Sequence, residues 1–233
     1  MTASLVPGRV LVIGAHPDDA ELYAGGTIAN WLSSGAVVGF LILTDGRLGS
    51  HDPAIDPAEV AVTRLAEAKA AARILGVDEI VFGGSADGNL EHSREAATEL
   101  VAATIRGFRP DIVIGHDPWR LYELHPDHRA AGFATTDGAI GAREWNAFPS
   151  LRERGLAPHR AKELWLMGTT QPDVYIDIEA SLPKKLDALA AHESQFAHLD
   201  DWREKVEGWA RQVGAERGYR AAEAFHRINP AQS

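Results

Sequence analysis

Two clusters of ionisable residues have the composition of a metal site. The first follows an apolar run, Val10–Ala15, and places His16, Asp18, Asp19 and Glu21 within six residues. Charge at the end of a buried strand is costly unless a partner compensates it. A divalent cation is a suitable partner, because imidazole and carboxylate groups together bind Zn²⁺ and similar metals. This cluster therefore predicts a metal site at the tip of a strand.

The second cluster is the sequence His-Pro-Asp-His at 125–128. Its two histidines are three residues apart at the start of a predicted helix, so their side chains can point into one space. The strand predicted over 111–115 lies beside the first strand in the usual doubly wound order. We therefore expect His16, Asp19 and His128 to meet where the strand order reverses. Three protein ligands and an open position are typical of a catalytic zinc site.

Composition limits the classes of protein to consider. The chain has 233 residues, enough for a substantial core, and no cysteine, so any zinc must be held by histidine and carboxylate groups. The formal net charge of −10 argues against nucleic-acid and anionic-membrane partners, which favour basic patches. No apolar run approaches the roughly 20 residues of a membrane span, and no signal peptide is visible. We expect a cytoplasmic protein.

Strand-like and helix-like segments alternate along the chain. Strands are predicted over 10–15, 37–43, 79–82, 111–115, 162–167 and 173–178, and helices over 20–34, 57–75, 93–108, 127–141, 181–197 and 200–213. This order favours an α/β fold: a single Rossmann-like, doubly wound, mostly parallel sheet with flanking helices, as one domain over 1–233. Trp202 and Trp209, seven residues apart, predict a stripe facing the core or a partner.

A dinucleotide is the first alternative ligand for such a fold. Its binding site needs the pattern G-x-G-x-x-G, so that the backbone can approach the pyrophosphate. The corresponding turn here reads Gly14-Ala-His-Pro-Asp-Asp19. Two carboxylates would stand where two phosphates bind, and this repulsion argues against NAD or FAD at this position.

The two clusters together resemble the zinc-dependent N-acetylglucosaminyl deacetylases of the PIG-L/LmbE-like family. The likeness rests on HPDDAE at 16–21 and HPDH at 125–128, with weaker matches in the expected order at 44–46, 64–67, 75–77, 87–90 and 192–195. It implies metal-dependent hydrolysis of the N-acetyl amide of an N-acetylglucosamine-type conjugate, a small molecule, with release of acetate and a free amine.

The resemblance also implies roles for single residues. His16, Asp19 and His128 match the metal ligands, Asp18 the general base, and His125 the group that stabilises the oxyanion. This chemistry is consistent in itself, because zinc acidifies its bound water and a carboxylate beside a ligand can accept the proton.

Further positions match less specifically. Asp127 is expected to orient His125, and Arg64 to hold the substrate, with a surface pair to Glu67 as the alternative. Asp87 is either a substrate contact or a turn residue. The sequence leaves the roles of a remaining set unassigned: His116, His192, Arg47, Arg120 and Arg143.

Two other functions stay open at this point. One is an amidase that acts on a larger sugar-amide conjugate with the same zinc chemistry. The other is a non-catalytic module that binds a sugar or nucleotide, although binding alone needs no base such as Asp18 beside a metal. Zn²⁺ is the expected cofactor, and the same ligands also suit Fe²⁺, Co²⁺ or Ni²⁺. The sequence defines neither the group attached to the sugar nor whether the chain forms a homo-oligomer.

Overall fold

The computed structural model describes residues 6–230. Its centre is a sheet of seven strands in the order β3-β2-β1-β4-β5-β7-β6. The strands are β1 (Arg9–Gly14), β2 (Val37–Thr44), β3 (Glu79–Ser85), β4 (Ile112–His116), β5 (Glu163–Met167), β6 (Val174–Asp177) and β7 (Ala222–Ile228). The first five are parallel, and β7 is antiparallel to both of its neighbours. The predicted α/β fold with a doubly wound, mostly parallel sheet is confirmed.

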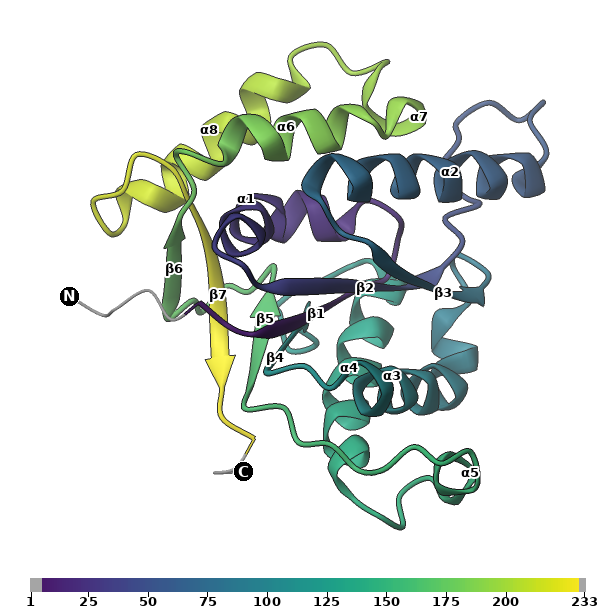
Figure 1. The fold of residues 1–233 in the computed structure, drawn as a ribbon. Helices are drawn as coiled ribbons and strands as arrows, with labels where there is room; N and C mark the ends of the chain where they lie inside the picture. The colour runs from purple at the N-terminus through teal and green to yellow at the C-terminus, as the bar shows by residue number, and fades with distance from the viewer. Residues whose placement is uncertain (1–5, 231–233) are drawn as a thin grey trace.

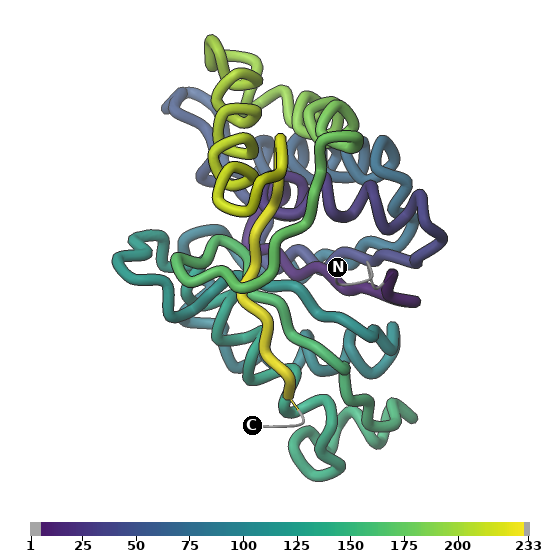
Figure 2. Tube along the Cα trace, turned by 90° about the vertical axis from the view of Figure 1, so that its left-hand side faces the viewer, coloured from purple at the N-terminus to yellow at the C-terminus, as the bar shows by residue number. Residues whose placement is uncertain are grey.

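Helices cover both faces of the sheet (Figure 1). One face carries α1 (Asp19–Ser33), α2 (Pro57–Leu75), α6 (Leu182–Ala190), α7 (Glu193–Phe196) and α8 (Trp202–Ala215), and the other carries α3 (Arg94–Phe108), α4 (Pro126–Arg143) and α5 (Pro149–Glu153). A short 3₁₀ helix, Leu90–Ser93, precedes α3. Figure 2 shows the same two layers from the side on which β6 and β7 lie. No helix among residues 6–230 is both long and apolar enough to cross a membrane.

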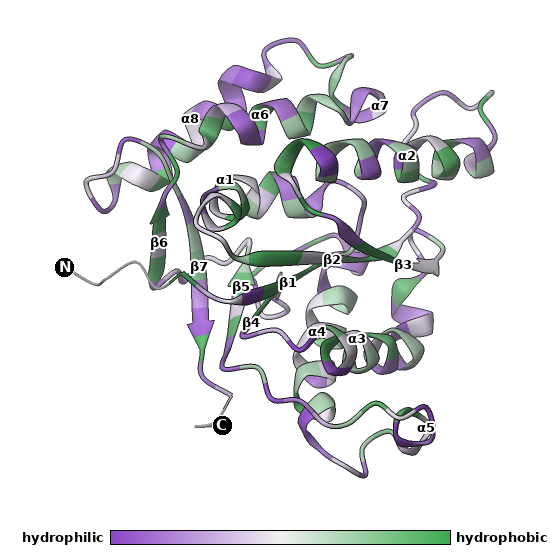
Figure 3. Ribbon diagram, viewed as in Figure 1, coloured by the Kyte–Doolittle hydropathy of each residue, from purple (hydrophilic) through white to green (hydrophobic). Residues whose placement is uncertain are grey.

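The sheet separates two hydrophobic clusters because successive side chains of a strand point to opposite faces. Val10 and Val12 pack with the α1 layer, whereas Leu11 and Ile13 pack with the α3 and α4 layer. β2 is buried from its second residue onward and hydrophobic along its length (Figure 3), as expected of a strand covered on both faces. A third cluster lies between α6 and α8.

A buried ion pair between α6 and β7 holds α1 in place. Lys185 of α6 is 1% exposed, and its Nζ donates to Glu223 of β7 (2.6 Å) and to the Leu22 carbonyl (2.8 Å). The Glu223 carboxylate accepts the N–H groups of Gly26 and Thr27. All of these charges and polar groups have partners, as a buried pair requires. The ion pair therefore connects α6 and β7 to α1, the helix that begins at Asp19.

The last third of the chain differs most from the sequence prediction. The helix predicted over 181–197 is two helices, because the backbone leaves helical geometry at His192, whose ring is buried 3.7 Å from Glu21. The helix predicted over 200–213 begins two residues later. α5 and β7 were missed. The sequence of β7, Ala-Glu-Ala-Phe-His-Arg-Ile, does not alternate between apolar and polar residues, and the strand buries Glu223 while Ala224 is only partly buried.

Gly26 provides a test of the packing around α1. A Cβ atom there would lie 2.7 Å from the Cβ of Ile178, whereas a Cβ at Gly208 of α8 would meet nothing within 4 Å. We expect Gly26→Ala to lower the free energy of unfolding by about 1–3 kcal/mol through overpacking. Gly208→Ala is the matched control and should raise it by up to about 1 kcal/mol, because alanine favours a helix. Urea denaturation measures both, and equal effects would contradict this packing.

Candidate active site

The two ionisable clusters lie together at the carboxyl ends of β1 and β4. His16 and Asp18 occupy the turn after β1, and Asp19 is the first residue of α1. The 125–128 cluster forms the start of α4, the helix that follows β4. β1 lies between β2 and β4, so this edge is the switch point where doubly wound sheets bind ligands. A cavity of about 490 Å³ opens beside it.

Three side chains face one another at the spacing of metal ligands. His16 Nδ1 lies 3.2 Å from His128 Nε2 and 3.6 Å from Asp19 Oδ2. His128 Nε2 lies 3.4 Å from Asp19 Oδ1. Ligand atoms placed about 2.0–2.2 Å from a tetrahedral zinc ion are separated by about 3.3–3.6 Å. Asp19 approaches His16 through Oδ2 and His128 through Oδ1, so the two imidazoles and the carboxylate surround one point beside the cavity at separations that suit a cation.

Other donors lie close to the same point. His125 can replace Asp19 in a set with His16 and His128, and His116 can replace His16 in a set with Asp19 and His128. A third set joins His16 to Asp87 and Asp127. The spacing of donors alone therefore allows more than one ligand set, and the hydrogen bonds of each side chain distinguish their roles.

The two carboxylate oxygens of Asp19 have different partners. Oδ2 accepts the backbone N–H of His16 (2.7 Å) and lies 2.9 Å from His116 Nε2, whereas Oδ1 faces His128. Burial opposes ionisation of this carboxyl, but the charge and hydrogen bond of His116, with the bonds to His128 and His16, hold its pKa well below the usual value. The sequence left His116 unassigned. The structure places it against Asp19 and stacks its ring on that of His128, 4.3 Å between centroids.

His16 is surrounded by carboxylates. Its Nε2 lies 3.2 Å from Asp87 Oδ1 and 3.5 Å from Asp127 Oδ2. Burial disfavours the protonated ring, yet hydrogen bonds to Asp127, Asp19 and Asp87 outweigh it and raise the pKa of His16 to about 12. Such a ring is in strongly negative surroundings that also attract a metal cation. A carboxylate on Nε2 orients the ring and leaves Nδ1 to coordinate.

Asp127 has different partners from those expected. Its side chain accepts the N–H groups of Gly88 (2.6 Å) and Leu90 (3.1 Å). Burial opposes its ionisation, but hydrogen bonds from His16, Gly88 and Leu90 lower its pKa to about 2. The backbone N–H of Asp127, not its carboxylate, contacts His125, donating to Nδ1 at 3.3 Å. In the neutral His125 ring, the proton is therefore on Nε2.

Arg64 points into the site. It is buried, and its guanidinium donates to Asp18 Oδ1 (2.9 Å) and to the Gly46 carbonyl (3.0 Å). Glu67, the alternative partner, instead accepts the N–H and hydroxyl of Ser194. Gly46 has a φ of +67°, and a Cβ there would lie 2.6 Å from Arg64 Nη1, so a glycine lets the guanidinium approach. Arg64 and Asp18 both line the cavity.

Several residues singled out from the sequence lie elsewhere or keep open roles. Asp87 lines the cavity, but its second oxygen accepts the Leu48 N–H, so its contact with a substrate stays a prediction. Arg47, Arg120 and Arg143 each pair with a nearby acid. Tyr23, which the sequence analysis missed, lies 5.5 Å from the ring of His116. Its position one helical turn after Asp19 was the available signal.

Comparisons with known proteins give a consistent picture. The family described as GlcNAc-PI de-N-acetylase (PIG-L) matches residues 11–139. Diacetylchitobiose deacetylase of Thermococcus kodakarensis is 39% identical over 219 residues, 93% of this chain and 82% of that protein. A 1D-myo-inositol 2-acetamido-2-deoxy-alpha-D-glucopyranoside deacetylase of a Mycobacterium species is 30% identical, covering 84% and 77%. N,N′-diacetylchitobiose deacetylase of Pyrococcus horikoshii, solved with its inhibitor MPG, superimposes with a TM-score of 0.89 at 33% identity, covering 96% of this chain and 84% of that one.

The two hydrogen bonds of Asp127 generate a prediction about stability. Asp127→Ala leaves the Gly88 and Leu90 N–H groups without an acceptor, which should lower the free energy of unfolding by about 2–5 kcal/mol. Asp137→Ala on the same helix is the control, since that side chain is exposed, and should change it by less than about 0.5 kcal/mol. Urea denaturation measures the free energy of unfolding of both variants. An unchanged free energy of unfolding in Asp127→Ala would show that these bonds do not stabilise the segment at 88–90.

Proposed function

This chain belongs to the PIG-L family of GlcNAc-PI de-N-acetylases, and from that premise we propose that it is a metal-dependent N-deacetylase. It hydrolyses the N-acetyl amide of an N-acetylglucosamine-type conjugate to acetate and a free amine. The observation that carries this proposal is the cluster of His16, Asp19 and His128, whose nitrogen and carboxylate oxygen atoms approach one another to 3.2–3.6 Å beside an open cavity. We further propose that the enzyme acts in the cytoplasm as one domain over 1–233.

The proposed metal ligands are His16, Asp19 and His128. Zn²⁺ is the proposed metal, because two imidazoles and one carboxylate suit it, as they suit Fe²⁺, Co²⁺ or Ni²⁺ to a lesser extent. When bound, the metal acidifies a water molecule and polarises the amide carbonyl. His116 and Asp87 act as positioning residues, because each makes a hydrogen bond to one ligand and so fixes its orientation.

Asp18 is the proposed general base. Its carboxylate lines the cavity one residue before a ligand, within reach of a water molecule there. The Arg64 guanidinium donates to its Oδ1 at 2.9 Å, which fixes the direction of the carboxylate. The proton that Asp18 takes from water is then available for the leaving nitrogen. The oxygen of that water molecule enters acetate, and the proton completes the free amine.

His125 is proposed to stabilise the negative charge that develops on the carbonyl oxygen. The Asp127 N–H occupies its Nδ1 and leaves Nε2–H as a donor. Burial, together with the neighbouring His16 and His128, lowers the pKa of His125, which favours the neutral ring. A base and an oxyanion donor on either side of the ligands favour catalysis over a module that only binds a sugar.

Acetate release tests this proposal. Purified enzyme with Zn²⁺ should release equal amounts of acetate and free amine from N,N′-diacetylchitobiose or N-acetylglucosamine. Chelation should lower the rate by at least about 10²-fold, since the metal supplies the water activation, and Zn²⁺ should restore it. His128→Ala should behave like the chelated enzyme, whereas His92→Ala, an exposed histidine outside the site, should behave like the wild type.

The other outcomes of that assay are informative. Release of an acid longer than acetate from a larger amide conjugate, with none from acetylated sugars, would point to an amidase. Tight sugar binding without hydrolysis of any amide would point to the binding module. Either outcome, or acetate release that is insensitive to chelation, would contradict the proposed function.

The Asp18–Arg64 ion pair allows a test of their shared role. Asp18→Asn should retain the metal and lower kcat by about 10²–10⁴-fold. Arg64→Ala should lower kcat more than it raises KM, because it releases the carboxylate. The double variant should be no slower than Asp18→Asn alone, since both residues act on one proton transfer. Multiplicative losses, or an effect of Arg64→Ala on KM only, would instead assign Arg64 to substrate binding.

A further inference from the structure

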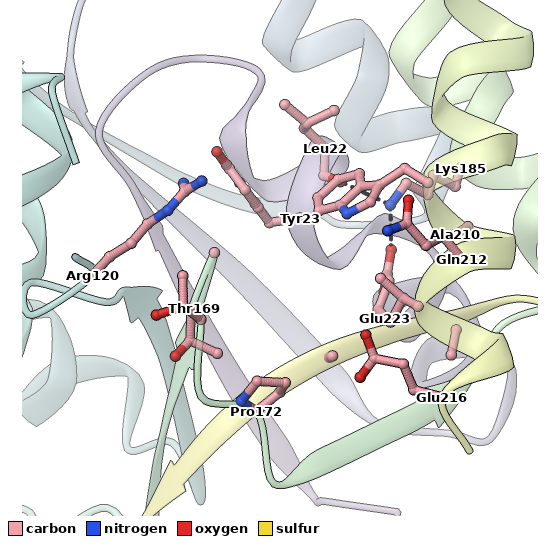
Figure 4. A pocket seen from close by; sticks show the side chains of 16 residues that line it. Leu22, Tyr23, Arg120, Thr169, Pro172, Lys185, Ala210, Gln212, Glu216 and Glu223 are labelled. Atoms are coloured by element: carbon pink, nitrogen blue, oxygen red, sulfur yellow. Dashed lines mark hydrogen bonds and ion pairs between the residues drawn. The ribbon is translucent and has the colours of Figure 1, made fainter. Parts of the chain in front are cut away.

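A second cavity adjoins the active site. It has a volume of about 590 Å³ and opens between α1, α8, β7 and the segment after β5 (Figure 4). Leu22 and Tyr23 line this cavity and also the one that holds the metal ligands. The two cavities are therefore neighbours on either side of one turn of α1, and the proposed mechanism uses only one of them.

The Tyr23 ring stands between the two cavities. It lies 6.4 Å from the ring of His128 on one side and 5.9 Å from the ring of Trp209 on the other. Figure 4 shows the Tyr23 hydroxyl and the Arg120 guanidinium directed toward each other at the edge of the second cavity. A molecule whose acetamido group lies at the metal ligands and whose remainder extends past Tyr23 would enter this space.

The charges that line the second cavity are already paired. Its two cations are Lys185, bound to Glu223 at 2.6 Å, and Arg120, bound to Glu123 at 3.0 Å. Glu216 accepts the Tyr175 hydroxyl and adds a negative charge to the wall. An anionic group would therefore find no cation without a carboxylate partner among these lining residues, and the buried pair would resist separation.

The remaining lining suits a neutral ring that carries hydroxyl groups. Thr169, Thr170 and Gln212 offer hydroxyl and amide groups, and Trp209 offers an indole that is 40% exposed. An aromatic surface with a few uncharged hydrogen-bonding groups is typical of a small-molecule pocket of this size. Trp202, expected on the same stripe, instead packs on Phe196 at 5.0 Å, so the two tryptophans have separate surroundings.

We propose that this second cavity is the subsite for the group attached to the N-acetylglucosamine unit, and that it takes an uncharged, polyhydroxylated ring such as a second sugar or a cyclitol. This inference rests on the proposed deacetylase function, because it places the acetamido group at the metal ligands. It assigns Trp209 as the packing surface for that ring and Gln212 as a hydrogen-bonding partner. It also means that conjugates with an anionic group at this position are poorer substrates.

Selectivity among substrates tests the subsite. Acetate release is compared for N-acetylglucosamine, N,N′-diacetylchitobiose and N-acetylglucosaminyl malate. The wild type should favour the disaccharide over the monosaccharide by about tenfold or more in kcat/KM, and should give the malate conjugate no such advantage. Trp209→Ala should lower the ratio of disaccharide to monosaccharide kcat/KM about tenfold. Gln212→Ala removes a smaller side chain than Trp209→Ala does, and it should lower the same ratio.

Trp145→Ala is the matched control. This tryptophan is also partly exposed and lies outside both cavities, so the variant should keep the wild-type ratio. An unchanged ratio in both Trp209→Ala and Gln212→Ala, an equal loss for all substrates, or a preference for the malate conjugate would overturn the proposal.

Calorimetry separates failure of the subsite from failure of the proposed function. N,N′-diacetylchitobiose and N-acetylglucosamine are titrated into the Asp18→Asn variant, with and without Trp209→Ala. Tighter binding of the disaccharide that depends on Trp209 supports the subsite even if no acetate is ever released. Equal affinity for the two sugars, with acetate release intact in the wild type, overturns the subsite and leaves the deacetylase function standing.

Discussion

Negative charge buried at the carboxyl ends of β1 and β4 is the constraint on which the rest of the structure depends. Asp19, Asp87 and Asp127 are all buried within one small region. Ionised groups removed from water are unstable without close partners. Backbone N–H groups and the rings of His16 and His116 supply part of that compensation. A divalent cation between the imidazoles and Asp19 supplies the rest in the account proposed here.

The fold provides the precision that such a site requires. The strand order places β1 beside β4, so that residues 112 positions apart, His16 and His128, come within 3.2 Å. The ion pair of Lys185 and Glu223 attaches to the backbone of α1, the helix that presents Asp19 at its first residue. These contacts lie outside the reacting groups, and they restrict the positions that the ligands can take.

The sequence was sufficient where a local pattern carries the information. The apolar run ending in His16 predicts a strand tip, and the alternation of strands and helices predicts the doubly wound sheet that brings two such tips together. It was insufficient where a contact joins distant segments. The bonds of Asp127 to the 86–90 loop, and the pairing of Arg64 with Asp18, depend on how loops fold over the sheet. Antiparallel β7 likewise became evident only from its partners.

The location of the bound metal is the most direct test of this account. Crystals grown with Zn²⁺ and measured at the zinc absorption edge should show one anomalous peak. We expect that peak about 2.0–2.2 Å from His16 Nδ1, His128 Nε2 and a carboxylate oxygen of Asp19. A peak that excludes Asp19 in favour of His125, one that excludes His16 in favour of His116, or no peak in this cluster would contradict the account.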